Sequence, residues 1–249
     1  MPNTSFPFLD SIKDKLGQFV VQFAFRIPIR TQLTAGEKKV LEDELRVLDP
    51  EHFQLFNGTA IKGPETLFQA TRQLPVGPST IMIPSFVFSK NSFSFIWPVR
   101  ILKKYVCNFH SFDTTDMNRR MSEWVVTVQN VISNLNCQRT GKIYEIVLGR
   151  FTEREKANLF QKLFSINLSD VGGTNLTFTR YVKLKGFLYN IQTKINYGQQ
   201  DLGSDFDIRM RIDINNRDLQ TSMEPPLMKK VWHFADATIN SHLEGLLEI

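Results

Sequence analysis

The chain has 249 residues, of which 42% are hydrophobic and 22% are charged, and these proportions are typical of a globular protein rather than a disordered one. Its net charge of +5 allows an anionic partner without requiring one. Two cysteines exclude a disulfide-rich framework, and a sequence without a secretory signal or a long apolar run predicts a cytoplasmic protein with no membrane span.

The N-terminal part of the sequence predicts a strand followed by a helix. Hydrophobic residues occupy every second position over residues 18–30, which is the period of a strand with one buried face. Thr34 and Glu37 form a Thr-x-x-Glu capping box, so we expect a helix to begin there. The glycines and prolines of residues 51–78 then predict irregular structure, with a short helical turn near residues 65–70.

A β-hairpin and a long helix are predicted next. Two alternating runs, residues 79–88 and 92–101, are separated by a Ser-Lys-Asn turn. Their phenylalanines share one face of the hairpin, and we expect that face to lie in the core. A cluster of helix-starting residues at 113–116 precedes apolar positions at helical spacing, which predicts a helix over residues 114–135.

The same order of elements returns in the second part of the chain. Residues 142–151 are predicted to form a strand, and Thr152 and Glu155 form a second capping box. Pro225-Pro226 is suited to the first turn of a last helix, since a proline there needs no intrahelical hydrogen-bond partner. The segment between them alternates and predicts three strands, over residues 176–184, 187–196 and 205–214.

The stretch FDIRMRIDIN, residues 206–215, shows the clearest separation of apolar from charged side chains. Its apolar residues fall on one parity and its charged residues fall on the other. We expect the apolar side chains to face the helices, and we expect Arg209, Arg211 and Asp213 to face an open side of the sheet. Asp213 is expected to pair with Arg211 or with a lysine on a neighbouring strand.

These elements predict an α+β protein in which helices cover the apolar face of one curved antiparallel sheet, leaving a saddle-like open face. Two pairs of segments are similar, namely residues 36–45 with 154–163 and residues 121–135 with 229–243. We therefore predict a duplicated β-α-β-β-(β)-α unit. Residues 1–140 would form the first half and residues 141–249 the second, and both halves would share the sheet.

The C-terminal part resembles a known family at the strand Arg211-Ile-Asp-Ile-Asn215 and at the helix from Trp232 to Leu246. It is a sporadically distributed family of uncharacterised prokaryotic proteins of about this length, which end in a strand similar to DIDIN and a helix with an aromatic start. Ala237 stands where the family has a histidine. The resemblance implies no established activity, although such a distribution is typical of accessory components of phage-defence or toxin–antitoxin systems.

The motifs for catalysis, phosphate binding and metal binding are weak. None of the four histidines accompanies a Gly-x-Ser-x-Gly turn, and the sequence has no glycine-rich phosphate loop. Cys107-x-x-His110 with Cys137 offers three ligands, whereas structural zinc usually takes four. Asp207 and Asp213 would be roughly 20 Å apart on one strand, which is too far to share an ion. We therefore predict no catalytic residue, no metal and no cofactor.

The predicted open face is the remaining candidate site. Its partner-binding residues are expected to be Arg26, Arg30, Tyr181, Lys183, Lys185, Arg209, Arg211 and Asp213. The first expectation is a protein partner on this face, with arginines that hold its acidic groups, or a second copy of the chain that pairs along an exposed edge of the sheet. Nucleic acid is the alternative, bound without sequence specificity and with bases stacked on the tyrosine. A small anion, an enzyme site that the sequence does not reveal and a face that is only solvated also remain open.

Overall fold

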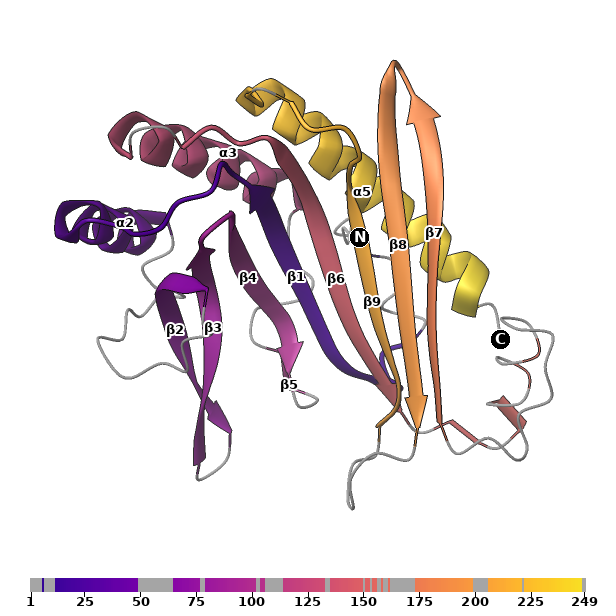
Figure 1. Ribbon diagram of the computed structural model, residues 1–249. Helices are drawn as coiled ribbons and strands as arrows, with labels where there is room; N and C mark the ends of the chain where they lie inside the picture. Colours follow the sequence, from indigo (N-terminus) through magenta and orange to yellow (C-terminus); the bar gives the residue numbers. More distant parts are fainter. Residues whose placement is uncertain are drawn as a thin grey trace.

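A computed structural model shows the fold of the protein (Figure 1). It describes residues 6, 12–48, 65–76, 79–101, 104–105, 114–132, 135–149, 151–152, 154–155, 158, 161, 173–198, 206–220 and 222–247. The described strands form one nine-stranded sheet, and the described helices lie on one of its faces (Figure 1). The protein is therefore α+β, as the sequence predicts.

All neighbouring strands in the sheet are antiparallel. Their order is β2-β3-β4-β1-β6-β9-β8-β7, and the short β5 lies beside β4. The central strands β1 and β6 pair over most of their length, so one continuous sheet contains strands from both parts of the chain. The strands are β1 (Leu16–Arg26), β2 (Thr66–Val76), β3 (Ser79–Ser89), β4 (Ser92–Ile101), β5 (Lys104–Tyr105), β6 (Arg139–Gly149), β7 (Gly173–Leu184), β8 (Phe187–Gly198) and β9 (Phe206–Asn216).

The helices form a second layer behind the sheet (Figure 1). In this layer α2 packs against α3, and α3 packs against α5. The helix α2 begins at the predicted capping box, in which the Thr34 N–H donates to the Glu37 carboxylate at 2.8 Å and the Glu37 N–H donates to the Thr34 hydroxyl at 3.2 Å. No helix among the described residues is long and apolar enough to cross a membrane. The helices are α2 (Ala35–Leu48), α3 (Thr114–Val131) and α5 (Pro225–Leu247).

The core lies between the sheet and the helices. Phe86, Phe88, Phe93 and Phe95 of the β3–β4 hairpin are buried there, as the alternation of their sequence predicts. Trp124 of α3 packs edge-on against Phe95, with the two ring centres 4.3 Å apart. Each fully buried apolar side chain of this size contributes about 1.5–3 kcal/mol, so this aromatic group fixes α3 on the sheet.

Strand β2 differs from the prediction. Its residues, 66–76, form a strand with two register shifts against β3, whereas the glycines and prolines predict irregular structure and a helical turn near residues 65–70. Within the described sheet β2 is an edge strand that pairs with β3 alone, and proline is tolerated in edge strands because one side of such a strand needs no hydrogen-bond donors. The prediction was wrong because a proline-containing edge strand has the composition of a loop. Residues 51–64, 77 and 78 lie outside the described residues.

The order of the strands is the same from either edge of the sheet. From the centre outwards, β1 is followed by β4, β3 and β2, and β6 is followed by β9, β8 and β7. In each half the long helix, α3 or α5, comes after these strands in the chain. The shared strand order describes the topology alone. The internal duplication, with its boundary between residues 140 and 141, stays a prediction.

Candidate functional site

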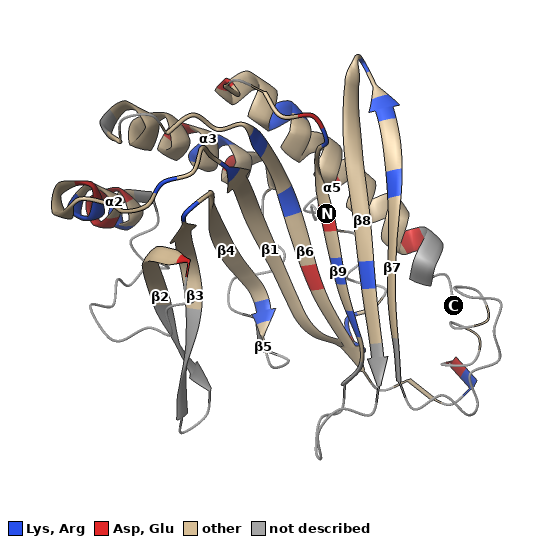
Figure 2. Cartoon of the chain, in the orientation of Figure 1, with Lys and Arg blue, Asp and Glu red and all other residues tan. Residues whose placement is uncertain are grey.

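Lys and Arg residues occur along β6, β9, β8 and β7 (Figure 2), and we call the face of the sheet opposite the helices the open face. Residues directly opposite each other on paired antiparallel strands point to the same face, so the register shows which side chains meet. Lys194 of β8 lies opposite Arg211 of β9, and Arg211 lies opposite Glu145 of β6. In the next row, Asn196 of β8 lies opposite Arg209 of β9. The predicted orientation of β9 is confirmed for Ile208, Met210, Ile212 and Ile214, which are buried in the core.

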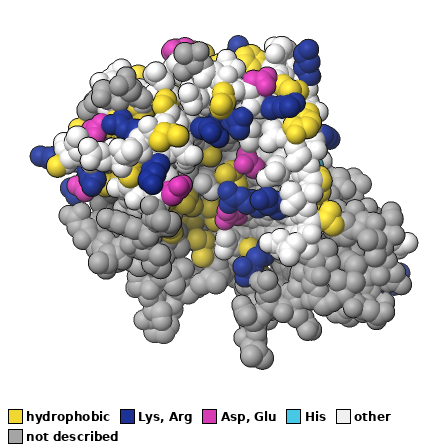
Figure 3. Space-filling view, in the orientation of Figure 1, with side chains coloured by type: hydrophobic (Ala, Val, Ile, Leu, Met, Phe, Trp, Pro, Cys, Tyr) yellow, Lys and Arg dark blue, Asp and Glu magenta, His cyan; other side chains and the backbone are white. Residues whose placement is uncertain are grey.

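A hollow of about 350 Å³ lies over these rows of side chains. Basic side chains gather over this face in the space-filling view (Figure 3). The hollow combines basic, amide and apolar side chains with one carboxylate, and its lining is Gly17, Gln18, Glu145, Ile146, Val147, Lys194, Asn196, Arg209, Met210 and Arg211. Four strands contribute to it, so it exists only because β1, β6, β9 and β8 lie side by side.

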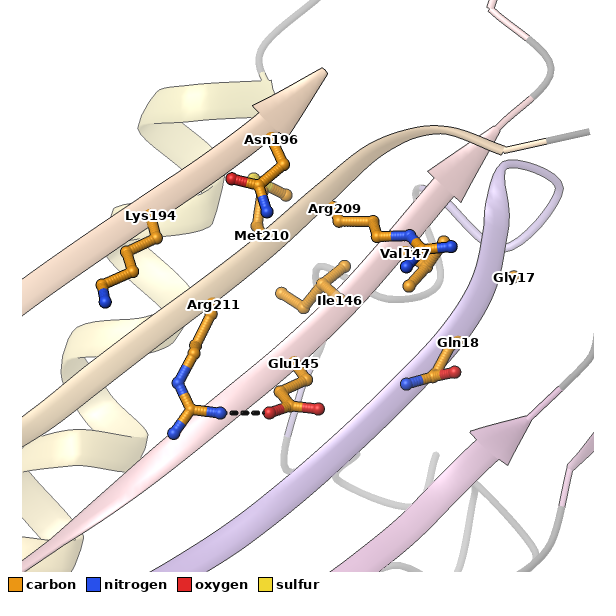
Figure 4. Close-up of a pocket in the computed structure, with 10 residues that line it drawn as sticks. All are labelled: Gly17, Gln18, Glu145, Ile146, Val147, Lys194, Asn196, Arg209, Met210 and Arg211. Atoms are coloured by element: carbon orange, nitrogen blue, oxygen red, sulfur yellow. Dashed lines mark hydrogen bonds and ion pairs between the residues drawn. The ribbon is translucent and has the colours of Figure 1, made fainter. Parts of the chain in front are cut away.

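Positive charge exceeds negative charge in the hollow. The Arg211 guanidinium donates a hydrogen bond to the Glu145 carboxylate and so forms an ion pair (Figure 4). The Arg209 side chain extends over Val147 instead, and Lys194 lies on the other side of Arg211 (Figure 4). Within the described part of the chain, neither Arg209 nor Lys194 forms an ion pair. We call Lys194, Arg209 and Arg211 the hollow cations.

Asp213 lies next to the hollow, two residues after Arg211 on the same strand. The expected pairing with Arg211 does not occur, since Arg211 binds Glu145 and Asp213 accepts a hydrogen bond from the Asn215 side chain at 2.7 Å. Burial raises the pKa of the Asp213 carboxyl, while this hydrogen bond and the neighbouring cations, Arg211 among them, act in the opposite direction. Asp213 therefore belongs to the open face without contributing to the lining of the hollow.

A second group of cations lies further along the open face. Arg26 at the end of β1 lies opposite Arg139 at the start of β6, and we call these two residues the end pair. The Arg139 side chain donates to the main-chain carbonyl of Arg217, and the Arg217 guanidinium lies 4.5 Å from the centre of the Tyr181 ring. Two predicted site residues, Arg26 and Tyr181, are thus on the open face but outside the hollow.

Of the other three predicted residues, Lys183 follows Tyr181 by two positions on β7 and so shares the open face, whereas Arg30 and Lys185 lie elsewhere. Arg30 lies beyond the end of β1, where its guanidinium donates to the Glu37 carboxylate at 2.5 Å beside the start of α2. Lys183 is exposed near the end of the edge strand β7. Lys185 occupies the turn between β7 and β8 with a φ of 48°, and Gly186 follows with a φ of 84°. Positive φ at both positions is the geometry of a tight two-residue hairpin turn.

The sequence gives no direct sign of a buried ionic cluster between the sheet and α5. Lys142 of β6 is wholly buried, and its ammonium donates to both carboxylate oxygens of Asp236 at 2.7 Å. The Tyr144 hydroxyl donates to the same carboxylate at 2.8 Å and the Asn118 amide at 3.1 Å. The available signal was the position of Lys142 on the apolar parity of β6. Because this cluster is enclosed, it fixes α5 on the sheet rather than contacting a partner.

The described residues contain no group of three or more His, Cys, Asp or Glu side chains that could hold a metal ion. Cys137 is a buried free thiol, and burial raises its pKa to about 12, so it stays protonated and unreactive. Burial also lowers the pKa of His242, whose ring shares a hydrogen bond with the Thr193 hydroxyl at 3.1 Å. Other residues considered for metal binding or catalysis lie outside the described part: His52, Cys107, His110 and the side chain of Asp207.

Comparisons with protein-family models, with curated proteins and with solved structures gave no match. The geometry of the open face is therefore the basis for assigning a function. Of the features described, the hollow is the one that brings several charged side chains from separate strands to one accessible place.

Proposed function

We propose that the protein is a non-catalytic binding protein that holds an acidic segment of a protein partner on its open face. One observation supports this most strongly: the hollow brings three cations together with one carboxylate, and Lys194 lies directly opposite Arg211. Like charges directly opposite each other on neighbouring strands destabilise a sheet by a few tenths of a kcal/mol to about 1 kcal/mol. A bound carboxylate would offset this repulsion.

The other residues of the hollow suit the same ligand. Arginine binds a carboxylate through two parallel N–H···O bonds, and Arg209 is exposed and directed over an apolar side chain rather than toward an acidic one. Gln18 and Asn196 add amide groups that can donate to or accept from a peptide main chain. Apolar neighbours lower the local dielectric and so strengthen a charge-assisted bond.

The non-catalytic part of the proposal rests on the chemistry of the lining. No serine, threonine, cysteine or histidine is present among the ten residues that line the hollow. Serine, threonine, cysteine and histidine are common nucleophiles or general bases, and lysine and carboxylates also serve in these roles. Lys194 is exposed, whereas a catalytic lysine is usually desolvated or placed next to another cation in an enclosed pocket. The one carboxylate, that of Glu145, is bound to Arg211. A recognition role therefore explains these residues more simply than a reaction does.

A nucleic-acid strand is the second candidate, and Tyr181 is the observation that favours it. This side chain is 55% exposed on the open face, with the Arg217 guanidinium over its ring. Exposed rings and guanidinium groups form the surfaces on which proteins stack unpaired bases. Binding of labelled single- and double-stranded oligonucleotides at low and moderate salt, compared with Arg209→Ala/Arg211→Ala, tests this candidate. A phosphate contact predicts affinity that falls linearly with the logarithm of salt concentration and is lost in the variant.

The experiment for the proposed function measures the binding of a fluorescein-labelled six-residue glutamate peptide by anisotropy at two salt concentrations. The site variant is Lys194→Gln/Arg209→Gln, and the control is Lys38→Gln/Lys39→Gln, which removes the same charge from the exposed side of α2. We expect at least tenfold weaker binding for the site variant and unchanged binding for the control. Equal losses in both variants would mean that only net charge attracts the peptide, and the proposal would then be wrong.

A further inference from the structure

We infer that the acidic segment of the partner lies extended along the open face and spans two cationic subsites, with acidic residues six positions apart. The first subsite is formed by the hollow cations and the second by Arg26 and Arg139. This inference rests on the proposed function, and it adds the conformation, direction and charge spacing of the partner segment.

The end pair, like the hollow, places two cations directly opposite each other on neighbouring strands. Arg26 is directly opposite Arg139 on the central ladder of the sheet, just as Lys194 is directly opposite Arg211. The main-chain carbonyl of Arg217 accepts a hydrogen bond from Arg139 and so orients its guanidinium. Arg26 is exposed beside it. Both subsites therefore hold a pair of cations whose mutual repulsion an anion would relieve.

The register of the strands gives the spacing between the two subsites. Arg139 and Glu145 both lie on β6, and Glu145 is the residue opposite Arg211. Six residues along a strand correspond to roughly 20 Å, and the two strand spacings between the subsites add about 10 Å across the sheet. Together the two offsets correspond to roughly 22 Å, and six residues of an extended peptide cover roughly 20 Å. Two side chains six positions apart point to the same side, and the flexible cations of the subsites can reach over the remaining distance.

The surface between the subsites suits a peptide better than a nucleic acid. Gly141 and Ile143 of β6 and Gln22 of β1 are neutral, whereas Asp213 and Glu145 are acidic. A nucleic-acid strand has one negative charge for about every 3.4 Å of helix axis, so it would place phosphates beside these carboxylates. A peptide avoids that repulsion, because only two of its residues need to be acidic and the residues between them can be uncharged.

The test compares two fluorescein-labelled peptides of identical composition, each with two aspartates in an otherwise serine and glycine sequence. The aspartates are six positions apart in one peptide and two positions apart in the other, so net charge is the same. Affinities are measured by anisotropy for the wild-type chain, for Arg26→Gln and Lys194→Gln, and for the control Lys38→Gln. All three substitutions remove one charge from a side chain with appreciable solvent exposure. A thymidine oligonucleotide is measured in parallel.

The expected result is that the wild-type chain binds the six-apart peptide at least tenfold more tightly than the two-apart peptide. Arg26→Gln should remove this difference by weakening only the six-apart peptide, whereas Lys194→Gln should weaken both peptides and Lys38→Gln neither. Equal affinities in the wild type, with both peptides weakened by Lys194→Gln, would overturn the inference and leave the proposed function in place. If no variant differs from Lys38→Gln, both are wrong. Tighter binding of the oligonucleotide, lost in Arg26→Gln, would overturn the inference in favour of nucleic acid.

Discussion

Lys142 shows what a charged side chain needs inside a protein. Its ammonium is wholly buried, and burial lowers its pKa while the Asp236 carboxylate acts in the opposite direction. The ammonium has three N–H donors, and the two bonds to Asp236 together with the face of the Phe23 ring, 4.6 Å away, surround it. The same carboxylate accepts from Tyr144. Asp236 is therefore the acceptor that allows two polar groups of β6 to lie beneath α5.

We predict that Asp236→Asn lowers the free energy of unfolding by about 3–5 kcal/mol, because it leaves the buried ammonium without a counter-charge. The triple variant Lys142→Met/Tyr144→Phe/Asp236→Leu should recover part of that loss, since it replaces the ammonium, the carboxylate and the hydroxyl bound to it by apolar groups of similar volume. Urea denaturation followed by circular dichroism measures both. A loss below 1 kcal/mol for Asp236→Asn would show that water reaches the ammonium and that the site is not enclosed.

The pairing of β6 with β9 depends on a residue without a side chain. Gly141 lies opposite Asn215, and a Cβ at that position would lie 2.5 Å from the Asn215 Cβ and also clash with the main-chain carbonyl oxygen of Ile214. Main chain and Cβ cannot move aside as the end of a flexible side chain could. The close approach of these two strands also sets the positions of Arg209 and Arg211, because both residues belong to β9.

We expect Gly141→Ala to destabilise the protein by about 1–3 kcal/mol, which is the usual cost of overpacking. Gly36→Ala is the matched control, because Gly36 lies in the first turn of α2 and the nearest atom to an added Cβ there is 4.0 Å away. That control should be neutral or stabilise by up to about 1 kcal/mol, since alanine has the higher helix propensity. Equal unfolding midpoints for the two variants would contradict the close approach.

The strands that were predicted correctly are those whose burial in the fold produces a pattern visible in the local sequence. β1, β8 and β9 alternate because one face of each is covered by helices, and period-two alternation is a direct consequence of that burial. β2 was missed because Pro75 and the glycines and prolines around the strand indicate a loop unless the strand is known to be at an edge. Edge position is decided by pairing with distant segments, so no local pattern could reveal it.

The candidate site was predicted in part for the same reason. The parity of β9 placed Arg209 and Arg211 on the open face, but their neighbours depend on which strands lie beside β9. Glu145 is 66 residues away from Arg211 in the sequence, and only the antiparallel register places them opposite each other. Lys194 belongs to the predicted strand over residues 187–196, whereas Arg139 lies before the predicted strand over residues 142–151, and nothing in the sequence shows that each faces another cation.

Repulsion between the opposed cations of the two subsites lowers the free energy of unfolding of the protein. We predict that Lys194→Gln and Arg26→Gln each raise the free energy of unfolding by about 0.2–1 kcal/mol, because each removes one of two directly opposed cations. The two gains should add, since residues more than about 10 Å apart without shared partners act independently. Thermal and urea unfolding of the single and double variants measures this.

The control for these substitutions is Lys38→Gln on the exposed side of α2, which should change stability by less than about 0.5 kcal/mol. A loss of stability in Lys194→Gln or Arg26→Gln would mean that the cation is held by favourable contacts, and the argument from repulsion would not hold for that subsite. A gain in stability together with weaker peptide binding is the combination expected of residues retained for recognition.

The central position of β1 has a consequence for synthesis of the chain on the ribosome. β1 is the first strand to be made, and one of its two neighbours, β6, begins only at Arg139. At about 5–20 residues per second, the interval between the two strands is roughly 6–25 s. During that time the edge of β1 that pairs with β6 has no partner, and the strand carries four alternating apolar residues from Phe19 to Phe25. The N-terminal part of the sheet therefore keeps an unpaired edge during synthesis, and this edge is closed only when β6 emerges and pairs with β1.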